Sequence, residues 1–162
     1  MTRFALAAAA AVLLAAGPGQ AAVFNSISPN QLERVLAGEK GTVEVDLSEE
    51  DTTLDGRVDG VSYTVFFYEC DGGDFEDPAK PDSACLGFEY RAYFSDYPSD
   101  SETVNEWNDS YHYGSLWRDS DGDLALQLNV IVEGGIADEN IRVTFDWWRA
   151  VIESFEDFMK DR

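Results

Sequence analysis

Hydrophobic residues recur at helical spacing over residues 139–159. At about 100° per residue, one stripe of this segment is apolar and rich in aromatic rings, whereas charged side chains fill the opposite side. The stripe consists of Ile141, Phe145, Trp148, Ile152, Phe155, Phe158 and Met159, with Val151 at its edge. Burial of one such aromatic side chain contributes about 1.5–3 kcal/mol. The pattern therefore predicts a long amphipathic helix that anchors the domain against an apolar surface.

Several other segments are predicted to be strands, because apolar and polar residues alternate along most of them. These segments are 42–47, 53–58, 61–70, 86–94, 113–118 and 123–132. Asp59-Gly60 and Asp121-Gly122 each separate two consecutive segments and are typical of tight hairpin turns. An antiparallel sheet is therefore expected.

Two shorter helices are predicted from their N-terminal signals. Ser28, Pro29 and Gln31 have the order of a capping box with proline at the first helical position. Ser101 is expected to cap a second helix that ends near Ser110. The resulting order is helix, strands, helix, two strands and long helix. This order predicts a single α+β domain in which helices cover an antiparallel sheet.

The first 22 residues have the pattern of a secretory signal peptide. Arg3 precedes an apolar run over residues 4–16, a Gly-Pro-Gly break follows, and small residues stand before the expected cleavage site. No later segment reaches the roughly 18 apolar residues that a membrane span requires. We therefore expect residues 23–162 to form one domain, without a membrane span, in the periplasm or outside the cell.

The chain contains two cysteines, Cys70 and Cys85, which bracket the loop between two predicted strands. An even number of cysteines in an exported protein suggests a disulfide bond. Closing a loop of this size is worth about 3 kcal/mol in the chain-entropy model. Redox catalysis is not indicated, because the Cys-x-x-Cys spacing is absent.

Charge narrows the classes of partner. The sequence has 32 acidic and 11 basic residues, a formal net charge of −21. Such a chain is not expected to bind nucleic acid through its general field. A cationic partner or metal ions are one interpretation of this charge, and a well-solvated surface is the other.

Three segments carry a resemblance to a known family. They are 65–68 (VFFY) before Cys70, 105–108 (NEWN) before the second hairpin, and 134–136 (GGI) before the long helix with its DWW sequence at 146–148. In this order they resemble the YbjN-like family, described as bacterial sensory transduction regulators. The family fold is similar to that of type III secretion chaperones. The resemblance implies a protein-binding or regulatory module without known catalytic residues, and no cofactor is expected.

Candidate catalytic and metal sites are sparse. His112 is the single histidine, and no Gly-x-Ser-x-Gly motif accompanies it, so a hydrolase remains only an alternative. Asp119, Asp121 and Asp123 resemble part of a calcium loop, but the loop lacks the glycine and glutamate that an EF-hand requires at its sixth and twelfth positions. A plain hairpin turn is favoured. An acidic secreted module that binds calcium or another cation is kept as a second alternative.

The aromatic residues outside the predicted core suggest a binding surface. Phe66, Tyr68 and Tyr93 lie on strand faces opposite the regular apolar rows, and Trp147 lies beside the helical stripe. If helices cover only one face of the sheet, these residues form an exposed aromatic patch, a feature that often marks protein interfaces. Alternatively, a loop or a second copy in a homodimer buries them. The main prediction is a non-enzymatic module of the cell envelope that recognises a protein partner.

Overall fold

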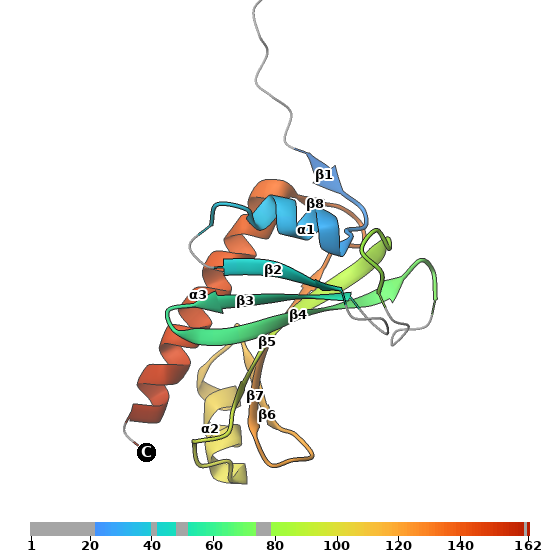
Figure 1. The fold of residues 1–162 in the computed structure, drawn as a ribbon. Coiled ribbons are helices and arrows are strands. Elements are labelled where there is room, and N and C mark those ends of the chain that lie inside the picture. The colour runs from blue at the N-terminus through green and yellow to red at the C-terminus, as the bar shows by residue number, and fades with distance from the viewer. Residues whose placement is uncertain (1–21, 40–41, 48–51, 74–78, 161) are drawn as a thin grey trace, which may run out of the picture.

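The computed structural model describes residues 22–39, 42–47, 52–73, 79–160 and 162 (Figure 1). Within these residues the chain forms three helices, a six-stranded sheet and a two-stranded ribbon. The predicted α+β class and the order of the elements are confirmed. Residues 1–21 of the expected signal peptide lie outside the described part of the chain.

The large sheet is antiparallel throughout, with the strand order β2-β3-β4-β5-β7-β6. Its strands are β2 (Thr42–Leu47), β3 (Thr52–Val58), β4 (Val61–Cys70), β5 (Cys85–Phe94), β6 (Ser115–Arg118) and β7 (Leu124–Ile131). The two-residue strands β1 (Val23–Phe24) and β8 (Ile136–Ala137) pair with each other. Sequence periodicity did not predict this ribbon, because two residues are too few to show an alternation. The predicted hairpin at Asp59-Gly60 is present, with positive φ at both residues.

The short helices begin at capped residues. Before α1 (Pro29–Leu36), the Gln31 N–H donates to Ser28 Oγ at 3.2 Å, and the Ser28 N–H donates to Gln31 Oε1 at 2.9 Å, as the capping box predicts. At α2 (Ser101–Ser110) the cap is Asp100, whose carboxylate accepts the Thr103 N–H at 2.8 Å. The prediction that Ser101 is the cap was therefore wrong by one residue. Serine and aspartate are both favourable caps, so adjacent candidates cannot be separated by residue type.

The long helix α3 (Asp138–Lys160) lies against one face of the sheet (Figure 1). Its aromatic stripe is buried there. Trp148 and Phe145 are fully buried, and Trp148 stacks on Tyr90 of β5 with ring centroids 5.8 Å apart. Every residue of the predicted stripe is buried except Phe158, which is half-buried. None of the helices in the described residues has the length and apolar character that crossing a bilayer requires.

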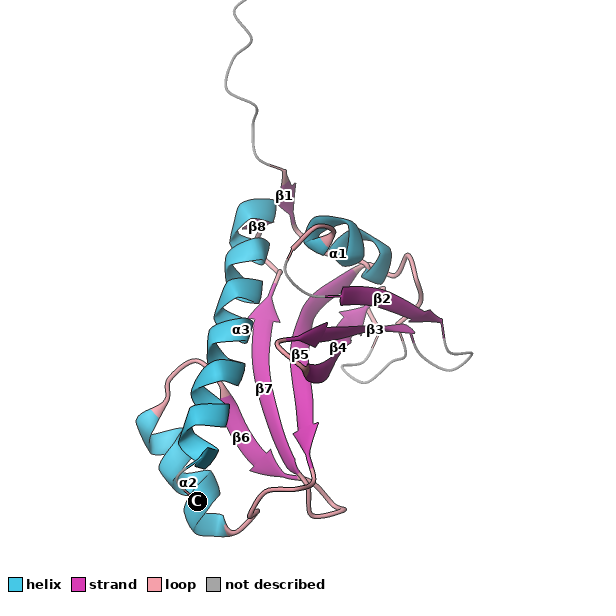
Figure 2. Ribbon diagram, turned by 60° about the vertical axis from the view of Figure 1, so that its left-hand side comes forward, coloured by secondary structure: helices cyan, strands magenta, loops and turns pink. Residues whose placement is uncertain are grey.

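The other two helices join α3 on the same side of the sheet (Figure 2). Helix α1 lies beside α3 and the β2–β3 end of the sheet. Helix α2 lies along the C-terminal half of α3, where Trp107 meets Phe155 edge-on at 5.6 Å. The helices therefore share one face of the sheet, and the opposite face has no helix over it within the described residues.

Candidate functional site

The face of the sheet opposite α3, here called the open face, gathers side chains from several strands. Side chains alternate between the two faces along each strand, so register decides which of them become neighbours. Phe66 of β4 lies opposite Glu89 of β5. Tyr93 of β5 shares a row with Trp117 of β6, with a small alanine of β7 between them. Arg91 lies between these two rows.

Arg91 is the centre of this group. Its Nη1 donates to the Tyr93 hydroxyl at 3.0 Å, and its Nη2 donates to the Tyr68 hydroxyl at 3.1 Å. The guanidinium carbon lies 4.5 Å from the ring centroid of Phe66 and 5.5 Å from that of Trp117. A guanidinium within about 6 Å of aromatic faces gains cation–π attraction. These four aromatic residues, Arg91 and Glu89 are called the Arg91 cluster below.

Burial makes the electrostatics of the Arg91 cluster strong. The side chain of Glu89 is 5% exposed and forms an ion pair with Arg91, which is 19% exposed. Burial, and next the charge of Glu89, raise the pKa of the Tyr68 hydroxyl above its ordinary value, so Tyr68 stays neutral. Removing charges from water is costly, and the ion pair together with the hydrogen bonds from Arg91 to Tyr68 and Tyr93 offsets part of that cost. The cluster therefore holds a guanidinium in a fixed position, with its charge balanced by the carboxylate of Glu89.

The Arg91 cluster also presents accessible aromatic surface. Tyr93 is 45% exposed, and Phe66, Tyr68 and Trp117 are half-buried. Trp117 is held in place by a hydrogen bond from its Nε1 to Gln127 Oε1 at 2.9 Å. Rings that are fixed in orientation yet accessible lose little conformational entropy when a partner binds, so this surface suits recognition.

The structure brings together three of the four predicted patch residues. Phe66 and Tyr68 of β4 meet Tyr93 of β5 around the guanidinium of Arg91. Trp147 is not among them, because it lies on α3, 47% exposed, with its ring 5.1 Å from that of Tyr113.

Sequence reasoning missed Arg91, Glu89 and Trp117 as members of the site. Alternation along β5 places Arg91 and Glu89 on the same face as Tyr93, so this part of the signal was present in the sequence. The position of Trp117 depends on the pairing of β5 with β7 and of β7 with β6, which alternation does not reveal.

In the acidic turn at residues 119–123, the first carboxylate accepts hydrogen bonds from the backbone of the turn itself. Asp119 Oδ1 accepts the backbone N–H groups of Asp121 at 3.0 Å, and of Gly122 and Asp123 at 2.9 Å each. Gly122 has φ 98°, a conformation that favours glycine. The segment is thus a hairpin turn, as the sequence favoured. Among the residues that the structure describes, no group of three His, Cys, Asp or Glu side chains is placed to hold a metal ion.

His112 lies in the loop after α2, exposed, on the rim of a groove of about 680 Å³. The groove runs between β7, this loop and α3, and Tyr113 and Trp147 also line it. None of its described lining residues is an aspartate or glutamate that could orient the imidazole as in a catalytic triad.

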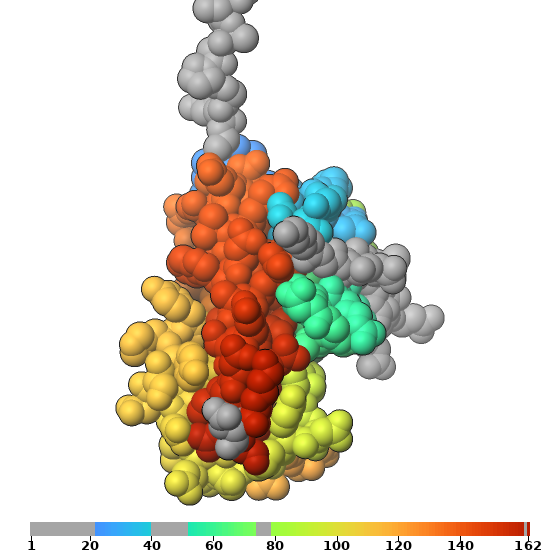
Figure 3. All heavy atoms as spheres, turned by 90° about the vertical axis from the view of Figure 1, so that its left-hand side faces the viewer, coloured from blue at the N-terminus to red at the C-terminus, as the bar shows by residue number. Residues whose placement is uncertain are grey.

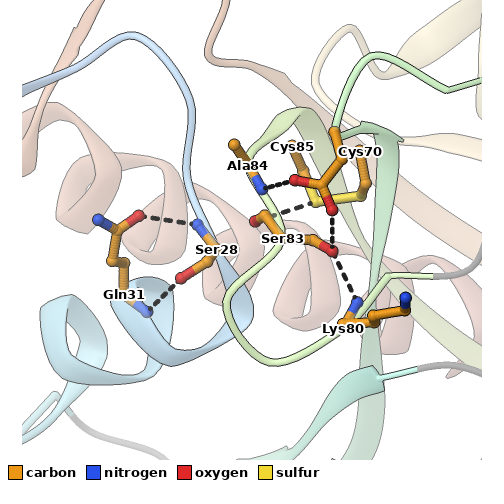
Figure 4. The surroundings of a disulfide bond; sticks show 8 residues. Ser28, Gln31, Cys70, Lys80, Ser83, Ala84 and Cys85 are labelled. Carbon is orange, nitrogen blue, oxygen red and sulfur yellow. Dashed lines mark hydrogen bonds between the residues drawn. A yellow bond between two sulfur atoms is a disulfide. The ribbon is translucent and has the colours of Figure 1, made fainter.

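Cys70 and Cys85 form a disulfide bond between the paired ends of β4 and β5 (Figure 4). Cys85 also exchanges backbone hydrogen bonds with Ile27, at 2.9 and 3.1 Å, just before α1. Asp71 accepts the Ala84 N–H at 2.9 Å and the Ser83 hydroxyl at 2.7 Å, and these bonds lower the pKa of its carboxyl. The bridge is compatible with an oxidising compartment.

Comparison with known proteins adds a family assignment. The family model of YbjN, whose description is "Putative bacterial sensory transduction regulator", matches residues 28–161, from the cap of α1 to just past the end of α3. No curated protein sequence matches the chain significantly. The match spans the sheet, the Arg91 cluster and all three helices of the described structure. The chain therefore belongs to the YbjN family.

Proposed function

We propose that this YbjN protein is a non-enzymatic regulatory module that recognises a protein partner through the Arg91 cluster. The observation that carries the proposal is a guanidinium held among aromatic rings on the sheet face that no described helix covers. Tyrosine, tryptophan and arginine are the residues most enriched among those that dominate binding energy at protein interfaces. The regulatory description of the family agrees with such a role.

The distribution of exposure supports an interface with a protein rather than a small-molecule pocket. Tyr93 stands out from the sheet, whereas Glu89 and Arg91 beneath it are largely buried. A fixed charged base with accessible rings above it resembles the centre of a protein interface, where anchors are surrounded by contacts that exclude water. The surface around Tyr93 offers its partner flat rings above a fixed ion pair.

We also propose that the protein acts outside the cytoplasm, after removal of a signal peptide at residues 1–22. The amino-terminal pattern and the Cys70–Cys85 bridge support this location. Mass spectrometry of the protein from native cells is expected to show a chain that begins at Ala22 or Val23. A cytoplasmic chain that retains Met1 would contradict export.

Crosslinking in native cells tests recognition by the Arg91 cluster. Tyr93→Ala combined with Trp117→Ala is expected to reduce the yield of the specific crosslinked complex about tenfold, because anchor residues typically cost more than 1 kcal/mol when truncated. Arg91 is left intact, since its removal would leave Glu89 buried without its ion pair and destabilise the fold. Val143→Ala, at an exposed valine of α3, is the control and should crosslink like the parent.

Circular dichroism and urea unfolding must show that the double variant folds as the parent does. If the folded double variant gives the parental yield of the complex, the Arg91 cluster is not the recognition surface.

A further inference from the structure

Strand β7 has a free edge over its second half. β6 pairs with β7 only from Ser115 opposite Gln127 to Arg118 opposite Leu124. β7 continues to Ile131, and there it pairs with β5 alone. Within the described residues, no strand lies beside β7 beyond Gln127 on this side.

The ladder determines which backbone groups face this free edge. In an antiparallel pair, both polar groups of a residue point to the same neighbouring strand, and successive residues point to opposite neighbours. Val132, just after β7, donates its N–H to Leu86 on the β5 side at 2.8 Å, whereas the carbonyl of Asp123 accepts a bond of 3.0 Å from the residue that follows β6. By this alternation, the N–H and C=O groups of Asn129 and Ile131 point away from the sheet.

The residues just before Ser115 could extend β6 along this edge, but contacts with α2 and α3 keep them away from β7. Trp107 Nε1 of α2 donates to the carbonyl of Gly114 at 2.8 Å, and the Tyr111 ring stacks on Trp107 at 4.0 Å. Gly114 is pressed against α3, because a Cβ at this position would lie 2.6 Å from Val151 Cγ1. The predicted start of this strand at Tyr113 was therefore wrong, and β6 begins at Ser115. The gap beside β7 is built into the packing of both helices.

At the outer edge of β6, a side chain satisfies the backbone groups that face away from the sheet. Asn108 Nδ2 donates to the Leu116 carbonyl at 2.8 Å, and Asn108 Oδ1 accepts the Leu116 N–H at 2.9 Å. One asparagine side chain thus takes the place of a neighbouring strand. Asn129 and Ile131 of β7 have no such substitute among the described residues, and an unpaired strand edge is a ready template for another chain.

The free edge forms one wall of the groove of about 680 Å³, and α3 contributes Thr144 and Trp147 to the opposite wall. Three of the six large hydrophobic side chains that the described residues expose line this groove: Ile131 at 77%, Tyr113 at 63% and Trp147 at 47%. Figure 3 shows α3 in orange and red on this side, with the yellow α2 and the loop after it alongside. An edge strand next to a groove with exposed hydrophobic side chains suits an added strand, in which the backbone supplies affinity and alternate side chains supply specificity.

We propose that this β7-edge groove binds an extended segment of a partner protein that pairs antiparallel to β7 and alternates apolar with basic side chains. Guest residues opposite Leu128 and Val130 would point toward α3, where Trp147 lines the groove. Guest residues opposite Asn129 and Ile131 would point toward the open face and exchange backbone hydrogen bonds with β7.

Charge decides in favour of a basic guest and against a second copy. The chain carries a formal net charge of −21, so two copies repel each other, whereas a cationic segment is attracted. The exposed residues Asp109 and Glu133 lie close in sequence to lining residues of the groove. This site goes beyond the function proposed above, because it uses side chains outside the Arg91 cluster and a different class of contact.

Fluorescence anisotropy tests the site directly with a short dye-labelled peptide in which valine and lysine alternate. The full chain is expected to bind this peptide, and replacement of its lysines by glutamate should weaken binding about tenfold or more. N-methylation of the lysine amides removes the donors that face β7 and should weaken binding to a similar extent. N-methylation of the valine amides is the matched control, since those amides point away from β7, and should leave the affinity within about twofold.

Two variants of the protein complete the test. Asn129→Pro removes an edge N–H without removing a bond of the sheet, and Trp147→Ala removes a wall of the groove. Each is expected to lower the affinity for the parent peptide about tenfold. Val143→Ala, at an exposed valine of α3 outside the lining, should bind like the parent. If Asn129→Pro does not fold, Trp147→Ala still tests whether the peptide binds in the groove. The pair of methylated peptides still tests whether it pairs with β7.

The outcomes that overturn the proposal are distinct from failure of the Arg91 cluster, since the peptide titration needs no native partner. Equal binding of the two methylated peptides would exclude pairing with β7, and parental binding by folded Trp147→Ala would exclude the groove. Sedimentation velocity tests whether a second copy of the chain, rather than a partner segment, occupies the edge. A parental dimer that Asn129→Pro converts to monomer would assign the edge to self-association instead.

Discussion

Replacing Trp148 by alanine is expected to lower the free energy of unfolding by about 3–5 kcal/mol, as tryptophan-to-alanine changes in cores do. Trp148 is 0% exposed, stacks on Tyr90 at 5.8 Å and meets Tyr63 edge-on at 6.0 Å. Alanine would leave a cavity between α3 and the sheet, because neighbouring rings can relax only partly into it. Equilibrium unfolding in urea, followed by circular dichroism, measures the loss.

The adjacent tryptophan provides the control for this experiment. Trp147 is 47% exposed, so Trp147→Ala should change the free energy of unfolding by about 0.5 kcal/mol. Trp148→Phe should cost much less than Trp148→Ala, since it keeps most of the ring volume. In addition, the Trp148 indole N–H has no hydrogen-bond acceptor among the described residues, so phenylalanine loses no bond there. Equal losses for the two alanine variants would contradict the observed packing of α3.

The marginal stability of single domains gives this result a functional consequence. A domain is stable by about 5–15 kcal/mol, so the Trp148→Ala change removes a large share of the total. Trp148 supports the sheet from the α3 side, and Arg91 lies on the opposite face of the same strand as Tyr90. Loss of binding in Trp148→Ala would therefore report unfolding. In contrast, Tyr93→Ala tests binding by the Arg91 cluster, and Trp147→Ala tests binding by the β7-edge groove.

Removal of the disulfide by Cys70→Ala and Cys85→Ala is expected to cost about 3 kcal/mol in the chain-entropy model. The bridged residues are separated by 15 positions, and both are buried, at 4% and 0% exposure. The loss arises mainly because the unfolded chain regains the freedom that the bridge had removed. The bridge also secures the end of β5 to which Ile27 is hydrogen-bonded, so the entry into α1 should loosen as well.

Urea unfolding with and without a reducing agent separates the bridge from the substitutions. The parent protein should lose about 3 kcal/mol under reduction, whereas the double alanine variant should be insensitive to the reducing agent. Thiol labelling after denaturation verifies that the bridge was open. A parent that keeps its stability with both thiols free would show that the bridge contributes little to the fold.

Local pattern was sufficient for the elements of this fold. The stripe of α3 and the alternation of β4 follow from periods of 3.6 and 2 residues. Both periods can be recognised within a short segment of the sequence. The capping box at Ser28 and the turn at Asp59-Gly60 depend on neighbouring residues only. Some predictions failed because the deciding partner lay elsewhere in the chain. The start of β6 is one case, because Trp107 and Val151 hold Gly114 away from β7.

The candidate site depended more strongly on the tertiary structure. Phe66, Tyr68 and Tyr93 could be selected from their strand faces, and they do meet around Arg91. Trp147 satisfied the same criterion, an aromatic ring outside the predicted core, yet it lies beside Tyr113 in a different environment. Periodicity assigns a residue to a face of its own element, but it contains no information on which elements are neighbours.

The amino-acid sequence by itself determined the class of elements, their order, the buried stripe of α3 and the acidic character of the surface, since each of these follows from local spacing or composition. The tertiary structure alone decided that Arg91 lies among rings from three strands. It also decided that β7 continues beyond Gln127, where its pairing with β6 ends. Both features arise from strand order and register. These are set by the total packing of α3 and the sheet, to which residues far apart in the chain contribute together.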